Sequence, residues 1–157
     1  MPRNVQPLGP ARILILAHRT AATPVLLDAV RTRAEEGPCE FTLLVPNVPL
    51  AMRRAEDPET GDTGEAEAQM ILDLALPLLE GACGQPVTGL VGDPNPLSAV
   101  ADAINRHGPF DEVILSTLPR RVSRWLRTNL PSKIAGLGLP VTTITAAGRR
   151  IPVPDPR

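Results

Sequence analysis

The chain has 157 residues, a formal net charge of −1 at pH 7, and 43% hydrophobic residues. This length predicts one domain with a sizeable core that needs neither disulfides nor metals, and the near-neutral charge is not typical of nucleic-acid-binding proteins. Aromatic residues make up only 2% of the chain, so bases are not expected to stack on it, and Leu, Val, Ile and Ala must build its core.

The chain begins with a polar leader, residues 1–10, which we expect to be flexible. Residues 12–17 (RILILA) form an unbroken apolar run, which is typical of a strand covered on both faces. Thr23 followed by Pro24 then predicts a helix start with Thr23 as its cap. A second apolar run, residues 41–45, predicts the second strand.

A polar stretch leads to the second predicted helix, residues 65–82, which Asp62 or Thr63 could cap. Pro77 lies inside this helical pattern and is expected to kink or shorten it. The third strand is predicted at residues 87–91, and Gly92-Asp93-Pro94 closes it.

Asn95-Pro96 predicts the start of a third helix, which Gly108 ends. Residues 113–115 form the fourth predicted strand, and a basic helical pattern follows it to about residue 137. The β-branched run at 141–145 (VTTIT) predicts the fifth strand, and residues 146–157 a flexible Pro-rich tail.

Strands and helices alternate through the whole chain in this interpretation. The alternation predicts an α/β protein of three layers, with an open five-stranded parallel sheet and helices on both faces. We expect one domain over residues 1–157. Ligands of such sheets bind beyond the carboxyl ends of the strands, where the strand order reverses.

Acidic and basic residues are unevenly distributed along the chain. No acid occurs between Glu112 and Asp155, while the same interval holds several basic residues: Arg120, Arg121, Arg124, Arg127, Lys133, Arg149 and Arg150. This asymmetry predicts a positive face and an anionic ligand or partner. Alternatively, these side chains are solvated and pair with the acidic half of the chain.

Several polar residues at the predicted strand ends have two interpretations each. Ser116 and Thr117 can bind an anion or cap the following turn. Arg120, Arg124 and Arg127 recur at helical spacing and can converge on a phosphate or carboxylate, or form a solvated face. His18 and Asp93 can contact a ligand or make structural hydrogen bonds, whereas Trp125 and His107 are typical structural residues.

Other chemistries find little support in the sequence. Cys39 and Cys83 lack CxxC spacing, and no Walker, GxGxxG or GxSxG motif occurs. We therefore expect no metal site and no required cofactor. The apolar run at 13–17 is too short for a signal peptide, and no run reaches membrane-spanning length. These features predict a cytoplasmic protein, and the preference for Arg over Lys is typical of GC-rich bacterial genomes.

In their order, these segments resemble the universal stress protein family over nearly all of residues 12–145. The resemblance rests on ILILAHRT at 13–20, Gly92-Asp93-Pro94, the fourth strand at 112–116, and Leu139-Pro140-Val141. It implies a fold of the adenine-nucleotide-hydrolase type with strand order 3-2-1-4-5. It also implies a homodimer that pairs through the last strand, VTTIT.

The chain departs from this family at its nucleotide-binding motif. Nucleotide-binding members carry Gly-x-x-Gly and, further along, Gly-Ser or Gly-Thr; the corresponding residues here are Ser116, Pro119, Asn129 and Leu130. Without the glycines the backbone cannot approach phosphates in the same way, and Pro119 has no amide hydrogen to donate. The aspartate of such members falls on His18. ATP or AMP is therefore not expected in the family's manner.

The sequence predicts a non-catalytic, stress-related or regulatory domain with a degenerate nucleotide site that binds a small anion or a nucleotide in an altered way. A nucleotide-dependent hydrolase or transferase, or a pure protein-interaction module, stays open. The candidate crevice consists of His18, Arg19, Thr20, Asn47, Gly92, Asp93, Ser116, Thr117, Pro119, Arg120, Arg121, Arg124 and Asn129. No membrane is expected as a partner, and nucleic acid is not favoured.

Overall fold

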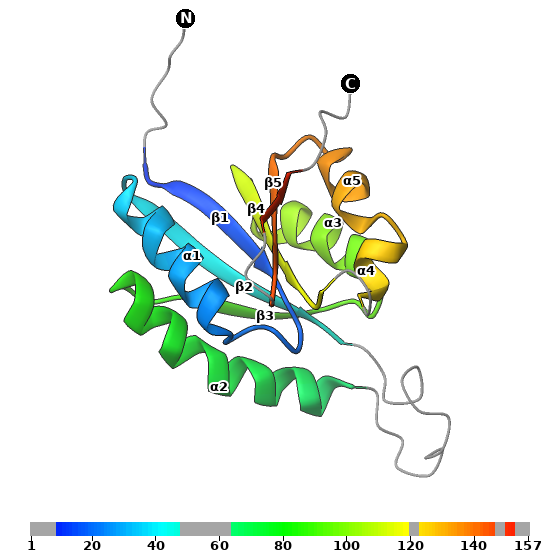
Figure 1. Cartoon of the computed structure of the whole chain (residues 1–157), viewed down its shortest axis with the longest axis horizontal. Helices are drawn as coiled ribbons and strands as arrows, with labels where there is room; N and C mark the ends of the chain where they lie inside the picture. Colours follow the sequence, from blue (N-terminus) through cyan, green and yellow to red (C-terminus); the bar gives the residue numbers. More distant parts are fainter. Residues whose placement is uncertain (1–8, 48–63, 120–122, 147–149, 153–157) are drawn as a thin grey trace, which may run out of the picture.

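The computed structural model describes residues 9–47, 64–119, 123–146 and 150–152, the last three by their main chain only (Figure 1). The strands are β1 (Ala11–Leu16), β2 (Cys39–Pro46), β3 (Thr88–Gly92), β4 (Glu112–Thr117), β5 (Val141–Thr145) and β6 (Arg150–Pro152). The helices are α1 (Pro24–Glu35), α2 (Glu65–Cys83), α3 (Pro96–His107), α4 (Arg124–Arg127) and α5 (Leu130–Ala135).

The strands form one sheet in the order β3-β2-β1-β4-β5-β6. The first five are parallel to one another, which confirms the predicted parallel sheet with order 3-2-1-4-5. Its strand order reverses between β1 and β4, where Leu16 pairs with Leu115. This is the position at which open parallel sheets place their ligands.

The end of the chain differs from the prediction, because residues 150–152 are a strand and not a tail. β6 runs antiparallel to β5 and pairs Ile151 with Thr143, so the VTTIT strand is not an edge of the sheet. A strand of three residues with proline at its end carries almost no periodic signal, and proline is tolerated on an edge strand.

Helices cover both faces of the sheet, as Figure 1 shows: α1 and α2 lie on one face and α3, α4 and α5 on the other. Side chains of β1 alternate between the two faces. Ile13 and Ile15 belong to the core beneath α1 and α2, whereas Leu14 and Leu16 belong to the core beneath α3 and α5. The unbroken apolar run of β1 is therefore explained by burial on both sides.

Local capping signals set the starts of two helices as predicted. The Thr23 hydroxyl accepts from the Leu26 amide at the start of α1, and the Asn95 side chain accepts from Ser98 N–H at the start of α3. The helix predicted at 65–82 is confirmed as α2, but its predicted cap, Asp62 or Thr63, is wrong, because the N-cap is Gly64, whose φ of 89° favours glycine. Pro77 does not end α2, which continues to Cys83.

The basic segment after β4 is not one helix. The four-residue α4 and the six-residue α5 are separated at Asn129, which has a left-handed φ of 62°. Asparagine tolerates this conformation, and Pro131 lies in the first turn of α5, where its missing N–H costs no helical hydrogen bond. Within the ranges described above, no helix is long and apolar enough to cross a membrane.

Candidate functional site

Four polar residues lie at the carboxyl ends of the two strands between which the strand order reverses. His18 and Thr20 follow the end of β1, and Ser116 and Thr117 end β4; all four are buried. The sequence placed these residues at the same crevice, and the register of β1 and β4 brings them to the same edge of the sheet. We refer to Thr20, Ser116, Thr117 and Ser123 as the hydroxyl cluster.

Hydroxyl groups of the cluster bind one another in pairs. The Oγ1 of Thr20 lies 2.7 Å from the Oγ of Ser116, which also donates to the Thr20 carbonyl at 3.3 Å. The Oγ1 of Thr117 lies 2.7 Å from the Oγ of Ser123. A hydroxyl keeps a further lone pair in such a pair, but all four side chains of the cluster are buried.

Ser123 shows what the second pair does for the fold. Its hydroxyl accepts the Leu126 amide at 3.0 Å and so caps α4. Capping was the alternative interpretation of Ser116 and Thr117; the structure gives that role to Ser123, with Thr117 holding the cap in place. Ser123 was not among the predicted site residues, although a serine at the start of a helical pattern is a recognisable capping signal.

Asn47 and Gly92 join the carboxyl ends of β2 and β3. The main-chain N–H of Asn47 donates to the Gly92 carbonyl at 2.8 Å. The side-chain Oδ1 of Asn47 is buried and accepts no hydrogen bond from any described residue. A Cβ on Gly92 would lie 2.8 Å from both Ala99 Cβ and Leu44 Cδ1. Gly92 is therefore required by the close packing of β3 against α3, in addition to its predicted place at the crevice.

Asp93 has a structural partner in the turn after β3. Its Oδ1 accepts the Asn95 amide at 2.9 Å, so it holds the turn from which α3 starts. The helix cap itself is Asn95. The structural interpretation of Asp93 is thus confirmed for this turn, and its carboxylate remains exposed to solvent.

The predicted basic and motif residues are only partly gathered at the crevice. Arg120 and Arg121 lie outside the described residues. Arg19, Arg124 and Asn129 are exposed, Pro119 is half-buried, and none of the four has a side-chain hydrogen bond to the hydroxyl cluster in the described ranges. The expected helical row from residue 120 to 127 is wrong in its described part, because α4 begins only at Arg124.

Trp125 is half-buried and packs against the core beneath α3 and α5, which confirms its structural interpretation. Leu130, the first residue of α5, is buried in the same core. The segment after β4 is thus fixed to the sheet by apolar contacts and by the Ser123 cap. Its arginines point to no described acid, because neither Arg124 nor Arg127 forms an ion pair there.

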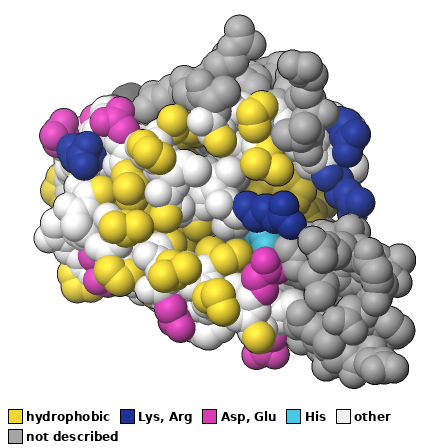
Figure 2. Space-filling model, turned by 60° about the horizontal axis from the view of Figure 1, so that its bottom comes forward, with side chains coloured by type: hydrophobic (Ala, Val, Ile, Leu, Met, Phe, Trp, Pro, Cys, Tyr) yellow, Lys and Arg dark blue, Asp and Glu magenta, His cyan; other side chains and the backbone are white. Residues whose placement is uncertain are grey.

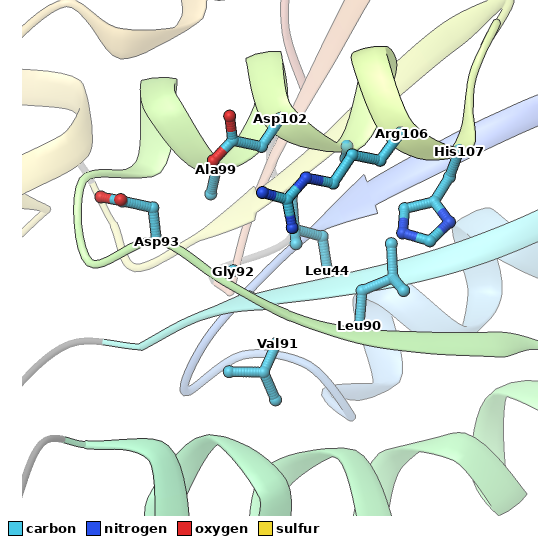
Figure 3. Close-up of a pocket in the computed structure, with 10 residues that line it drawn as sticks. Leu44, Leu90, Val91, Gly92, Asp93, Ala99, Asp102, Arg106 and His107 are labelled. Carbon is cyan, nitrogen blue, oxygen red and sulfur yellow. The ribbon is translucent and has the colours of Figure 1, made fainter.

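A hollow of about 160 Å³ lies on the α3 side of the sheet, near the edge strand β3 (Figure 3). Gly92 and Asp93 from the predicted crevice line it, but His18 and the hydroxyl cluster do not. Asp102, Arg106 and His107 also line it, and sequence reasoning missed them as ligand residues. Their spacing on one helix face next to Ala99 and Ala103 could have indicated a shared surface.

No group of three or more His, Cys, Asp or Glu residues within the described ranges could hold a metal ion. The features that carry the site are therefore the buried hydroxyl cluster with His18 at the reversal of strand order and the charged hollow at β3. No protein-family model matches this chain, and no curated protein matches it significantly.

Proposed function

We propose that this protein is a non-catalytic, regulatory or stress-related binding domain of the universal stress protein type. Its ligand is a small anion or an adenine nucleotide such as ATP or AMP, held in an altered pose at the carboxyl ends of β1 and β4. The observation that carries this proposal is the hydrogen bond between Thr20, after β1, and Ser116, in β4, at the reversal of strand order, with the buried His18 two residues before Thr20.

Asn129 supports the relation to nucleotide-binding members of that family. It occupies the position of a motif glycine, and its φ of 62° is one that favours glycine. This conformation is compatible with the glycine that such members carry, and Asn129 adds an exposed side chain at that place. The added side chain favours a ligand that sits further from the backbone than a nucleotide phosphate does in the family.

The hydroxyl pairs favour binding over catalysis. A serine or threonine nucleophile needs a base, such as histidine or a carboxylate, within hydrogen-bond reach. Ser116 bonds to Thr20, and Thr117 bonds to Ser123, so each hydroxyl has another hydroxyl as its side-chain partner. An uncharged hydroxyl does not activate its neighbour. Ser116 donates its proton to the Thr20 carbonyl, so what it can offer a ligand is a lone pair.

The proposal includes a homodimer formed by strand pairing. Because β6 covers β5, the strand available for pairing across a twofold axis is β6 and not the VTTIT strand. Light scattering after gel filtration tests this part: a monomer at micromolar concentration would refute the dimer without affecting the ligand.

Calorimetric titration of ATP, AMP and inorganic phosphate tests the ligand. We expect saturable binding of at least one of them, weakened about tenfold or more by Ser116→Ala. Ser98→Ala, on the exposed side of α3, is the matched control and should not change the affinity. Absence of heat with all three ligands would refute the proposal, and ATP turnover abolished by His18→Ala would favour a hydrolase instead.

A further inference from the structure

The hollow near β3 has an apolar floor made by small and buried side chains. Leu44 of β2 and Ala99 and Ala103 of α3 are at most 3% exposed, and Leu90 of β3 lines the side. Figure 3 shows the Val91 side chain pointing away toward α2, so Leu90 is the large side chain that β3 adds there. The hollow exists because α3 presents alanines to β3 where larger side chains would fill the space.

Charged side chains of both signs surround the opening. Asp102, Arg106 and His107 come from α3, and Asp93 comes from the loop after β3. Figure 3 shows the Arg106 side chain extending across the hollow, with Asp102 one turn earlier on the same helix. All four side chains are exposed, and Arg106 forms no ion pair with a carboxylate of the described residues.

The size of the hollow restricts its occupant. Its volume of about 160 Å³ is close to the roughly 150 Å³ of an apolar cavity that accommodates benzene. Sites for drug-sized ligands measure roughly 300–1,000 Å³. A nucleotide is therefore too large, whereas an apolar group of a few carbon atoms fits.

We propose that this hollow binds a free α-amino acid with a small apolar side chain, as a zwitterion. The guanidinium of Arg106 takes the carboxylate, and Asp102 takes the ammonium group. The apolar side chain lies against Leu44 and Ala99. This site is separate from the one in the proposed function and does not depend on it.

The paired charges explain why a zwitterion is preferred over a simple ion. Side chains four residues apart on a helix have Cβ atoms roughly 5–6 Å apart, a span that the two charged groups of one α-carbon can bridge. A lone anion at Arg106 would face Asp102 and Asp93, and a lone cation at Asp102 would face Arg106. For either ion, repulsion by the like charge nearby cancels part of the attraction.

Titration of the ¹⁵N-labelled protein with L-valine, followed by amide chemical shifts, tests the proposal. We expect the amide chemical shifts of Gly92, Ala99 and Arg106 to change and to saturate at millimolar concentrations of valine. Isobutylamine and isovalerate, which each lack one charged group of valine, should bind about tenfold more weakly or worse. Shifts that do not saturate, or isovalerate binding as tightly as valine, would overturn the zwitterion site.

Variants separate this site from general surface effects. Arg106→Gln and Asp102→Asn should each weaken valine binding about tenfold, whereas Arg127→Gln, an exposed arginine of α4, should not. Ala103→Leu should block the hollow and abolish binding; if it does not fold, the two exposed variants decide. Unchanged affinity in Arg106→Gln would refute the assignment. Ser116→Ala should leave valine binding intact, so failure here and failure of the nucleotide site are distinguishable.

Discussion

The hydroxyl groups of Thr20 and Ser116 lie 2.7 Å apart and connect the loop after β1 to the end of β4. Both side chains are buried, so their hydrogen bond replaces contacts with water that neither group can make in the folded state. The pair thus fixes the two strands between which the strand order reverses, and it shapes the base of the proposed crevice.

Thr20→Val and Ser116→Ala should each lower the free energy of unfolding by about 1–2 kcal/mol, because each leaves a buried hydroxyl without its partner. The double variant should lose less than the sum of the single losses, since both singles break the same bond. Urea denaturation measures all three. Strict additivity would show that the two hydroxyls do not interact in solution.

Arg33 of α1 and Glu112 of β4 form the shortest ion pair among the described residues. Nη2 and Nε of Arg33 donate to one oxygen of Glu112 at 2.9 and 3.1 Å, and the side chains are only 20% and 26% exposed. The hydrogen bonds that Arg33 donates to Glu112 raise the pKa of Arg33, against a lowering by burial. The stabilisation linked to this raised pKa is complete below the unfolded-state pKa of the guanidinium and is lost as pH rises through the folded-state pKa.

Glu112→Gln should therefore lower the free energy of unfolding by about 1–3 kcal/mol, because the hydrogen bonds lose their charge. Asp28→Asn is the matched control. Asp28 pairs with Arg31 at 3.5 Å, but the two side chains are 75% and 54% exposed, so its loss should cost less than about 0.5 kcal/mol. Equal effects in thermal or urea unfolding would contradict the difference in burial.

Leu72 and Leu74 lie two residues apart in α2 and differ sharply in burial. Leu72 is 3% exposed and packs in the core, whereas Leu74 is 67% exposed beside Met70 and Leu78. Figure 2 shows hydrophobic side chains gathered on the face of the molecule that it presents. The same leucine side chain thus stands in two environments within one helix.

Leu72→Ala should cost about 2–5 kcal/mol of unfolding free energy, since it leaves a cavity. Leu74→Ala should change it by less than about 0.5 kcal/mol. Chemical denaturation of both variants provides the comparison. A large loss in Leu74→Ala would mean that the outer face of α2 is covered in solution.

Much of the fold could be predicted because its signals are local. The run at Ile13–Leu16 has apolar side chains on both faces of the strand, which indicates a buried strand. Thr23 and Asn95 indicate the starts of their helices, because their side chains can cap them. The strand order was predicted from the family resemblance, because periodicity alone does not determine which strands are neighbours. β6 could not be predicted, because three residues become a strand only through pairing with β5.

The site was less predictable, since it depends on residues that are distant in sequence. Hydroxyl side chains at strand ends indicated a crevice. They did not indicate that Ser116 of β4 would form a hydrogen bond with Thr20 of the loop after β1. The arginine spacing assumed one continuous helix, which Asn129 interrupts. The hollow at β3 depends on Gly92 and Ala99 lying in contact, a relation that only the packed structure reveals.

Cys39 and Cys83 should differ in reactivity toward alkylating reagents. Cys39 is 5% exposed, and burial raises the pKa of its thiol, against a lowering by Arg33. Because the thiolate is the reactive form, Cys39 should react slowly even at about pH 8, slightly below the ordinary thiol pKa. Cys83 is half-buried and should react about tenfold faster or more, as measured by mass spectrometry of the modified peptides.

Unfolding provides the control for this difference, since both thiols should react at similar rates in concentrated urea. The raised pKa also has a consequence for stability: the folded state binds the Cys39 proton more tightly than the unfolded state does. The contribution of the Cys39 thiol to the free energy of unfolding is complete below the unfolded-state pKa and is lost as pH rises through the folded-state pKa. The wild-type protein should therefore lose more stability than Cys39→Ala between neutral and alkaline pH. Rapid alkylation of Cys39 in the folded protein would contradict its burial beneath α1 and α2.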